Sequence, residues 1–213
     1  MAIMKVIYRG AESLIGLSDF EGHDAIIKQR VAKSYRIKRL DDKLRKGRTR
    51  KEVKLLTEAR KIGIATPKIL QVDENNCSIV MENISGVRVK EFLLSADTNG
   101  VKKVCFEIGR IVGKLHQGNI VHGDLTTSNM ILKDDTIYFI DFSLGSISSR
   151  VEDKGVDLNL FSEALNSTHF KIAHECWRNF VEGYKNEYKN AEDIIKKVKE
   201  IRMRARYAER KEF

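Results

Sequence analysis

The chain has 213 residues, enough for one large domain or two small ones with a sizeable core. Hydrophobic residues make up 42% and charged residues 32% of it, and it has no apolar run of about 18 residues, which argues against a membrane protein. The three cysteines lack CxxC spacing and the amino terminus has no long apolar stretch, so we expect a reduced, cytoplasmic protein rather than a secreted disulfide scaffold.

The net charge of +9 is unevenly distributed. Segment 28–61 holds 15 Lys and Arg against 4 Asp and Glu, and segment 196–213 holds 8 against 3, whereas the chain between them is acidic. Solvated helix faces explain either basic segment taken alone. Two such segments in one small protein indicate a polyanionic partner, most simply RNA. The lack of an aromatic RNA-binding motif indicates contacts mainly with phosphates.

Three strands are predicted near the amino terminus, over residues 3–8, 13–17 and 25–29. The loop between the first two, from Gly10 to Ser13, has one glycine, which restricts the close backbone approach that phosphate binding needs. The Ser13 hydroxyl is a candidate phosphate donor, and an ordinary turn serine is the alternative. Lys28 ends the third strand, where a lysine taken alone is usually solvent-exposed.

The basic segment 31–61 has helical character. Thr49 and Glu52 have the spacing of a capping box, which predicts a helix that starts at Thr49 and ends near Gly63. The chain's only proline then precedes a predicted edge strand over residues 68–72. A buried strand over residues 77–81 follows it. A short helix and a longer, one-sided apolar helix ending near residue 118 come next.

The most informative stretch is HGDLTTSN, residues 122–129, which Asp141 follows twelve residues later. Two short strand-like segments separate these polar clusters, and an Asp-Asp turn between them predicts a hairpin. A hairpin brings its ends together, so Asp124 and Asn129 are expected to face Asp141. Phosphoryl transfer uses such a set: an Asp orients the attacking hydroxyl, and an Asn with a second Asp holds Mg²⁺ on the phosphates. An unrelated pair of polar loops would not explain the matching order and spacing.

The chain after Asp141 is too short for a long regulated loop, and Ser143 takes the place of the third-position glycine that such motifs usually carry. Asp157 is expected to bind the backbone of the 122–129 loop from behind. Three helices are predicted to follow, with Phe170 on the buried face of the second. The third is expected to end near Met203 and to continue as an exposed arginine-rich tail.

Together these motifs resemble a protein kinase with a reduced carboxyl-terminal part. HGDLTTSN, IDFSLG, KSYR, RTRKE and the arginine-rich end are similar to one family in particular: the small atypical kinase subunit of the KEOPS (EKC) complex, related to the RIO kinases. The short form resembles archaeal members. The resemblance implies an α+β, minimal bilobal kinase-like fold. Residues 1–84 would form an antiparallel-sheet N-terminal lobe, residues 85–202 a reduced, mostly helical C-terminal lobe, and residues 203–213 a basic tail.

The resemblance also implies roles for individual residues. Lys28 would hold the α- and β-phosphates of ATP, with Glu52 as its ion-pair partner and Glu58 as the alternative partner. The residues expected to surround the rest of the nucleotide are Gly10 and Ser13 at the phosphate loop, Met81 behind the adenine pocket, and the backbone groups of Glu82 and Ile84 at the adenine edge.

The implied function is that of an ATP- and Mg²⁺-dependent serine/threonine kinase or ATPase with weak autophosphorylation. Its family works with a tRNA threonylcarbamoyltransferase subunit, to which it is sometimes fused, and with other KEOPS subunits. The complex makes threonylcarbamoyladenosine next to the anticodon of tRNAs that read codons starting with A. Segments 28–61 and 196–213 would contact the tRNA.

Two other functions remain open at this stage. Small-molecule phosphotransferases also use an HGD motif, but they usually carry a larger C-terminal lobe than the roughly 55 residues that follow Asp157. The sparse glycine loop and Ser143 favour a pseudo-kinase that acts as a binding module. A pure scaffold, however, has no need for a Lys, a Glu, two Asp and an Asn at kinase spacing.

Overall fold

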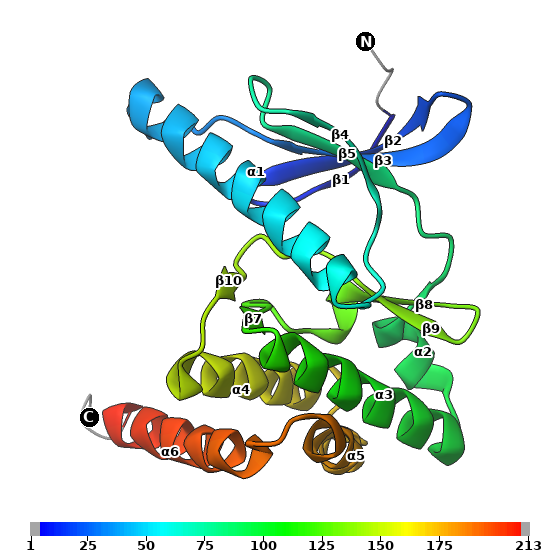
Figure 1. Cartoon of the computed structure of the whole chain (residues 1–213), viewed down its shortest axis with the longest axis vertical. Helices are drawn as coiled ribbons and strands as arrows, with labels where there is room; N and C mark the ends of the chain where they lie inside the picture. Colours follow the sequence, from blue (N-terminus) through cyan, green and yellow to red (C-terminus); the bar gives the residue numbers. More distant parts are fainter. Residues whose placement is uncertain (1–4, 210–213) are drawn as a thin grey trace.

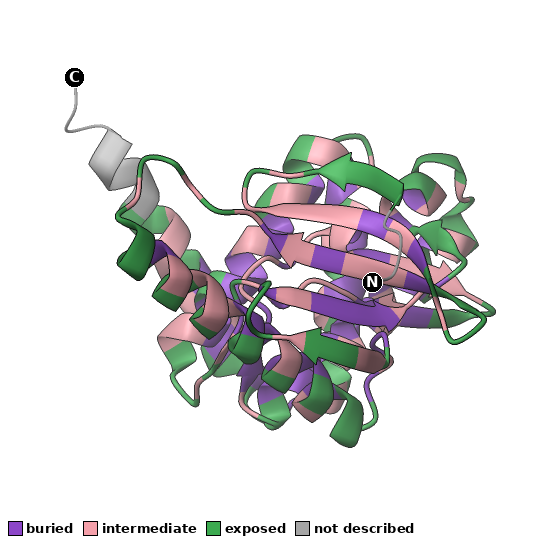
Figure 2. Cartoon of the chain, turned by 90° about the horizontal axis from the view of Figure 1, so that it is seen from above, coloured by how far each residue is buried: buried purple, intermediate pink, exposed green. Residues whose placement is uncertain are grey.

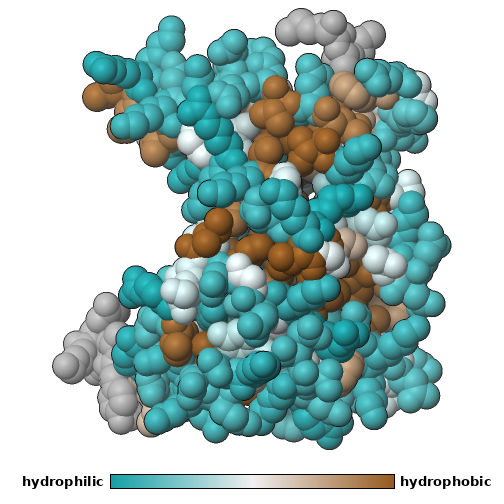
Figure 3. Space-filling view, viewed as in Figure 1, coloured by the Kyte–Doolittle hydropathy of each residue, from teal (hydrophilic) through white to brown (hydrophobic). Residues whose placement is uncertain are grey.

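The computed structural model describes residues 5–209, with side chains described as far as residue 204. A five-stranded sheet with one long helix lies above a set of helices, and the space-filling view narrows between the two parts (Figures 1 and 3). This is the α+β class that the sequence predicted. Among the described helices, none has the length and apolarity needed to span a bilayer.

The sheet of the N-terminal lobe is antiparallel, with strand order β1-β2-β3-β5-β4. Its strands are β1 (Lys5–Arg9), β2 (Ser13–Phe20), β3 (His23–Arg30), β4 (Ile69–Asp73) and β5 (Ser78–Glu82). Glu21 and Gly22 join β2 to β3 with positive φ angles of 55° and 81°, as a tight hairpin turn requires, so both strands run further than predicted. Burial is concentrated in the central strands, whereas the edge strand β1 is exposed throughout (Figure 2).

One helix, α1 (Lys38–Lys61), replaces the two helical pieces that the sequence indicated. The prediction that Thr49 begins a helix was wrong, because Thr49 is buried in the middle of α1 and its Oγ1 donates to the Arg45 carbonyl 2.9 Å away. No proline interrupts the segment, and Gly47 is tolerated at an open position. The helix ends as predicted, with Gly63 just beyond it at a φ of 78°.

The C-terminal lobe begins with the strand β6 (Val87–Arg88). Its other elements are α2 (Val89–Ser95), α3 (Thr98–Gln117), β7 (Ile120–Val121), the 3₁₀ turn η1 (Thr127–Asn129), β8 (Met130–Lys133), β9 (Thr136–Phe139), β10 (Ser146–Ile147), α4 (Val151–Thr168), α5 (Ala173–Glu187) and α6 (Ala191–Glu209). Two predictions about the last helices were wrong. Helix α4 continues to Thr168, so Phe170 lies between helices with 72% of its surface exposed. Helix α6 runs past Met203 to Glu209, and residues 210–213 lie outside the described part.

Helices α3 and α5 pack with their backbones in direct contact, and glycines make this approach possible. A Cβ on Gly109 would overlap the Phe180 carbonyl oxygen, and a Cβ on Gly183 would overlap the Phe106 carbonyl oxygen. Tyr184 is completely buried beside this contact. The pair therefore forms a rigid base under the loop of residues 122–129, which follows α3 and β7.

We expect Gly109→Ala to lower the free energy of unfolding by about 1–3 kcal/mol, because the methyl group has no room between α3 and α5. Gly47→Ala is the matched control. It adds the same methyl group inside α1 with nothing within 4 Å, and should stabilise the protein by up to about 1 kcal/mol. Urea unfolding of both variants measures the difference. Equal effects would contradict close backbone packing of α3 on α5.

Candidate active site

The predicted hairpin is confirmed, and it brings Asn129 next to Asp141. Strands β8 and β9 pair from Met130 with Phe139 to Lys133 with Thr136. The turn residues Asp134 and Asp135 have positive φ angles of 47° and 61°, as a two-residue hairpin turn requires. At the open end, Ile140 N donates to Asn129 O at 3.0 Å, which fixes the two polar clusters side by side.

Asp124 and Asn129 are bound to each other within the loop. Asn129 Nδ2 donates to the Asp124 backbone carbonyl at 2.9 Å and to Asp124 Oδ2 at 2.8 Å. Both side chains are half-buried. These bonds use the Asn129 amide nitrogen and Asp124 Oδ2, and they leave Asn129 Oδ1 and Asp124 Oδ1 unused. Neither oxygen accepts a hydrogen bond from a described residue, so both can bind a ligand.

Asp141 has a φ of 62°, a left-handed conformation that Asp tolerates better than most residues. The sharp turn sends neighbouring side chains in opposite directions. Phe142 is fully buried, with its ring 4.5 Å from that of His122, whereas the Asp141 carboxylate points toward the N-terminal lobe. The local backbone therefore anchors the motif in the core and presents its carboxylate to Lys28.

The Lys28 ammonium joins the two lobes. Its Nζ lies 2.7 Å from Glu52 Oε1 on α1, 2.6 Å from Asp141 Oδ1 and 2.9 Å from Ser143 Oγ. Lys28 and Glu52 are both almost completely buried. Of the two candidate glutamates the structure pairs Glu52 with Lys28, while Glu58 binds the exposed Lys61 at 2.9 Å.

Sequence reasoning missed two members of this cluster, Arg30 and Ser143. Arg30 Nη2 lies 2.5 Å from Glu52 Oε2 and 3.1 Å from Ser143 Oγ, and its side chain is 4% exposed. Strand periodicity could have indicated Arg30, because it follows Lys28 by two residues and must share its face. No local signal indicates the contacts of Ser143 with the N-terminal lobe, because Glu52 and Lys28 are 91 and 115 positions away in the chain.

The charged and polar neighbours of Asp141 favour the ionised form of its carboxyl group. Burial raises the pKa of Asp141, but the Lys28 charge and the hydrogen bonds from Lys28 and Ser143 outweigh it and lower the pKa to about 2. The carboxylate therefore stays charged at neutral pH, as a metal ligand must.

Asp157 supports the catalytic loop from below, as predicted. Its two carboxylate oxygens accept from the backbone N–H groups of His122 and Gly123, both at 2.8 Å, and His116 Nε2 lies 3.2 Å away. Burial raises the pKa of Asp157. The hydrogen bond and charge of His116, together with His122, nonetheless bring it below its usual value.

Gly123 is required by the backbone of this loop. It has a φ of 78°, and a Cβ there would overlap the Leu144 carbonyl. An arginine, which kinases with a phosphorylated loop carry at this place, does not fit the conformation.

The remaining predicted nucleotide contacts are less closely assembled. Ser13 pairs with Arg30 across the sheet, two residues from the Ile15–Lys28 pair, and Gly10 N donates to Ser13 O at 2.9 Å. The Ser13 hydroxyl and Gly10 have no described hydrogen bond to the Lys28 cluster. Their phosphate-binding role stays a prediction.

At the predicted adenine edge, Met81 and Ile84 are buried, and Glu82 N already donates to the Lys68 carbonyl at 2.9 Å. The backbone N–H of Glu82 is therefore already used within the N-terminal lobe. The roles of all three residues stay predictions.

The donor set suits Mg²⁺. Asp141 Oδ1 is used by Lys28 and Ser143, whereas Asp141 Oδ2 accepts no hydrogen bond from a described residue. Together with Asn129 Oδ1 it offers two oxygen ligands at the cleft. Hard oxygen ligands, one or two from the protein and the rest from phosphates and water, are what Mg²⁺ prefers.

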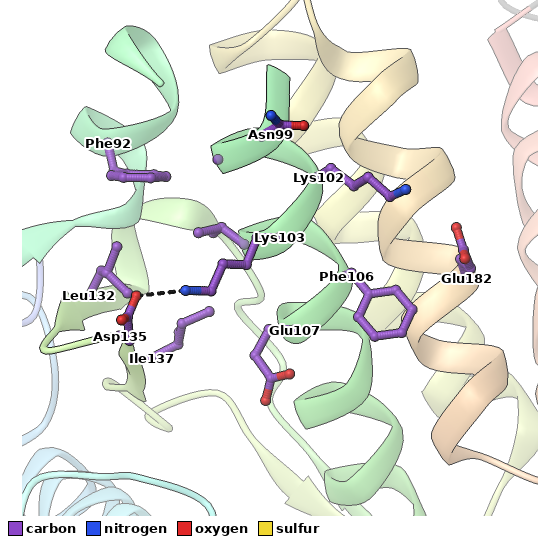
Figure 4. Close-up of a pocket in the computed structure, with 12 residues that line it drawn as sticks. Phe92, Asn99, Lys102, Lys103, Phe106, Glu107, Leu132, Asp135, Ile137 and Glu182 are labelled. Atoms are coloured by element: carbon purple, nitrogen blue, oxygen red, sulfur yellow. Dashed lines mark hydrogen bonds and ion pairs between the residues drawn. The ribbon is translucent and has the colours of Figure 1, made fainter. Parts of the chain in front are cut away.

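A separate hollow of about 660 Å³ lies on the flank of the C-terminal lobe, between α2, α3 and the hairpin (Figure 4). Phe92, Leu132 and Ile137 form its apolar wall, and Lys103 binds Asp135 across its mouth at 2.8 Å. None of the predicted site residues lines it. It is not part of the candidate active site.

We expect Asp157→Asn to lower the free energy of unfolding by about 2 kcal/mol at neutral pH, because a buried charged acceptor of two backbone N–H groups is lost. The pKa of Asp157 is lowered in the folded state, so its contribution is complete above the ordinary value of 3.8 and is lost as the pH falls through the folded value. Urea unfolding from pH 7 to 3 should therefore show wild type and variant converging in acid. A constant difference would contradict the charged role.

The chain has clear relatives. Residues 13–149 match the model of the RIO domain family. The chain is 44% identical to "KEOPS complex subunit Bud32" of Pyrococcus abyssi, covering 97% of this chain and 98% of that protein. It is 43% identical to a "Probable bifunctional tRNA threonylcarbamoyladenosine biosynthesis protein" of Methanosphaera stadtmanae, over 93% of this chain but 36% of that longer protein. The corresponding protein of Methanocaldococcus jannaschii is also 43% identical, over 96% of this chain and 37% of its own length.

Solved structures confirm the predicted kinase-like fold. WaaP in complex with acyl carrier protein superposes with a TM-score of 0.70 at 14% identity, covering 98% of this chain and 89% of WaaP. The Rio2 kinase of Chaetomium thermophilum, solved as an ADP/Mg²⁺-phosphoaspartate complex, superposes with a TM-score of 0.64 at 13% identity. That match covers 93% of this chain and 70% of the Rio2 chain. From the matching domain and its closely similar relatives, the chain belongs to the RIO-domain family of atypical kinases and, within it, to the group of the KEOPS subunit Bud32.

Proposed function

We propose that the chain is the ATP-dependent kinase/ATPase subunit of a KEOPS complex and supports threonylcarbamoyladenosine formation next to the anticodon of tRNAs that read A-starting codons. The similarity to the Pyrococcus subunit supports the assembly, and the names of the bifunctional relatives support the reaction. The observation that carries the proposal is the contact of Lys28 with both Glu52 and Asp141, because it joins a phosphate-binding cation to a metal-binding carboxylate.

Each residue of the site has a distinct task in this proposal. Bound Mg²⁺-ATP supplies the γ-phosphoryl group and the metal charge that favours its transfer. Lys28 Nζ binds phosphate oxygens while Glu52 holds the ammonium in place. Asn129 Oδ1 and Asp141 Oδ2 bind the metal. Asp124 Oδ1 orients a water molecule or a serine or threonine hydroxyl and accepts its proton.

The direct Lys28–Asp141 contact has a consequence for nucleotide entry. The three N–H groups of Lys28 Nζ already donate to Glu52, Asp141 and Ser143, so a phosphate oxygen can bind Nζ only by replacing one of these contacts. Glu52 and Arg30 belong to the N-terminal lobe and keep Lys28 in place, whereas Asp141 belongs to the C-terminal lobe. Nucleotide binding should therefore exchange one contact between the lobes for contacts with phosphates and metal.

We expect Asp141→Asn and Asp124→Asn each to lower ATP turnover by at least about 10²-fold with the fold intact, because one weakens metal binding and the other removes the proton acceptor. Asp135→Asn at the exposed hairpin tip is the matched control and should stay within about twofold of wild type. Phosphate release and circular dichroism measure turnover and folding. Full turnover in Asp141→Asn would contradict Asp141 as a metal ligand. Full turnover in Asp124→Asn would contradict Asp124 as the proton acceptor.

The partners in this proposal are the threonylcarbamoyltransferase subunit, other KEOPS subunits and tRNA. The similarity to the Pyrococcus subunit supports the protein partners. The basic segments 28–61 and 196–213 support phosphate contacts with tRNA, and the cytoplasm is the expected place of action. Gly123 leaves no arginine to read a phosphorylated loop. Control by bound partners rather than by loop phosphorylation follows from this.

We expect ATP turnover to rise when the threonylcarbamoyltransferase subunit and tRNA are added. Because phosphate contacts release counterions, the tRNA concentration needed for half of this rise should increase at least about tenfold between roughly 50 and 200 mM salt. A flat salt response would contradict phosphate contacts by the basic segments.

Lys28→Ala separates the enzyme from a scaffold. As an enzyme the chain should lose both turnover and tRNA modification. Full modification with Lys28→Ala would instead make it a binding module.

A further inference from the structure

A second, small hollow lies in the N-terminal lobe, between the loop before β2 and helix α1. Seven residues line it: Glu12, Arg30, Val31, Lys33, Arg36, Arg45 and Arg48. Five of these are cations and Glu12 is the one acid among them. Apart from Arg30, none takes part in the proposed phosphoryl-transfer site, so the catalytic proposal leaves this basic pocket unexplained.

Glu12 occupies the pocket as an internal anion. Its Oε2 accepts from Arg48 Nη1, and its Oε1 lies 3.7 Å from Arg36 Nη2. The hydrogen bond from Arg48 lowers the pKa of Glu12 against the effect of burial, and the charges of Arg48, Arg30 and Arg36 lower it further. The Glu12 side chain is nevertheless 40% exposed and sits on a loop, so it can leave the pocket without breaking the core.

The donors around Glu12 exceed what one carboxylate can satisfy. Arg30 Nε is buried and has no hydrogen-bond partner among the described residues. Lys33 Nζ donates only to the backbone carbonyl of Ala11, so no described carboxylate neutralises it. Arg45 is already bound by Asp41 and Asp42, and Arg36 also pairs with Asp41 at 3.5 Å; neither aspartate lines the pocket. Guanidinium groups converging in this way match a phosphate, which carries more charge and more acceptor oxygens than a carboxylate.

The surface next to the pocket suits RNA. Tyr35 is 76% exposed, so most of its ring is open for stacking. The Arg36 guanidinium lies over the ring, 5.2 Å from its centroid. Helix α1 continues outward with a mixed surface of hydrophilic atoms and apolar patches (Figure 3), and its Leu40 and Leu44 are 51% and 37% exposed. The exposed cations of its first turns include Lys38, Arg39 and Lys43, whereas Arg50 further along the helix is paired with Glu74. A chain of phosphates could therefore leave the pocket along this helix.

We propose that this pocket binds a backbone phosphate of RNA, that the Glu12 carboxylate fills it when no RNA is bound, and that Tyr35 stacks on an unpaired base beside that phosphate. The inference rests on the proposed contact with tRNA and names its site. It also connects RNA to the nucleotide, because Glu12 lies in the loop between Gly10 and Ser13 and Arg30 holds Glu52. RNA that displaces Glu12 would release the loop predicted to cover the phosphates.

Two matched pairs of variants of the full chain test the pocket by tRNA binding in fluorescence anisotropy. Arg36→Gln or Arg48→Gln should weaken binding about tenfold and reduce the salt slope by about one, because one phosphate contact is lost. Arg50→Gln removes the same charge from α1 outside the pocket, where Arg50 binds Glu74, and should change affinity less than about twofold. Equal losses in pocket and control variants would overturn the site.

Replacing the carboxylate in the pocket should change the affinity for tRNA in the opposite direction. Glu12→Gln should tighten tRNA binding by about three- to tenfold because it removes the competing anion, whereas Glu74→Gln should have little effect. Equal effects of Glu12→Gln and Glu74→Gln on tRNA affinity, or weaker binding by Glu12→Gln, would overturn the proposal that RNA displaces Glu12. Because Glu12 is exposed on a loop, this variant remains informative even if an arginine variant unfolds in thermal melts.

Tyr35→Ala should weaken binding of tRNA about tenfold but not that of inorganic polyphosphate, which has no bases. Equal losses for both probes would overturn the stacking and leave a general anion site. A wild-type chain that shows no salt-dependent tRNA binding would overturn the proposed tRNA contact as well. Salt-dependent binding with identical pocket and control variants would overturn the pocket alone. None of these measurements depends on ATP turnover.

Discussion

The structure depends on one buried ammonium group that is bound by carboxylates from both lobes. Lys28 belongs to the central sheet, Glu52 to the long helix α1 and Asp141 to the end of the C-terminal hairpin. Burying a charged group is costly unless it is paired and hydrogen-bonded, so the sheet, α1 and the hairpin must take one relative position to satisfy Lys28. In the proposed function, the same contact places the cation that would bind phosphate beside the carboxylate that would bind the metal. Architecture and chemistry therefore share one constraint.

The rest of the C-terminal lobe holds its half of this contact still. Asp157 binds two backbone N–H groups of the catalytic loop, and the buried Phe142 anchors the residue after Asp141. Behind them, Gly109 and Gly183 let α3 and α5 meet at backbone distance. A small C-terminal lobe can thus present Asp124 and Asn129 rigidly, with one hairpin and one buried carboxylate doing most of the positioning.

The features that depend on residues close together in the chain could be predicted from the sequence. The hairpin and the turn at Asp134 and Asp135 followed from the strand pattern, and Asp157 binds the loop of residues 122–129 as expected. The capping box at Thr49 failed because its pattern has another cause: Glu52 is needed for Lys28, and the Thr49 hydroxyl bonds back to its own helix. The prediction that Phe170 lies on a buried helix face failed because helix ends are set by tertiary packing as much as by periodicity.

What sequence could not supply is the meeting of distant segments. Ser143 contacts Glu52 across 91 positions of the chain, and no pattern near either residue predicts it. Arg30 gains its importance in the same way. It connects the catalytic cluster with a basic pocket whose members come from the loop before β2, the end of β3 and α1.

The most direct test of the central constraint is the metal dependence of ATP binding, measured by calorimetry with Mg²⁺ or with EDTA. Wild type should bind ATP at least about tenfold more tightly with Mg²⁺ than with EDTA, and Asp141→Asn should lose this difference while still binding ATP through Lys28. An Asp141→Asn variant that keeps the full magnesium dependence would show that the carboxylate facing Lys28 does not hold the metal.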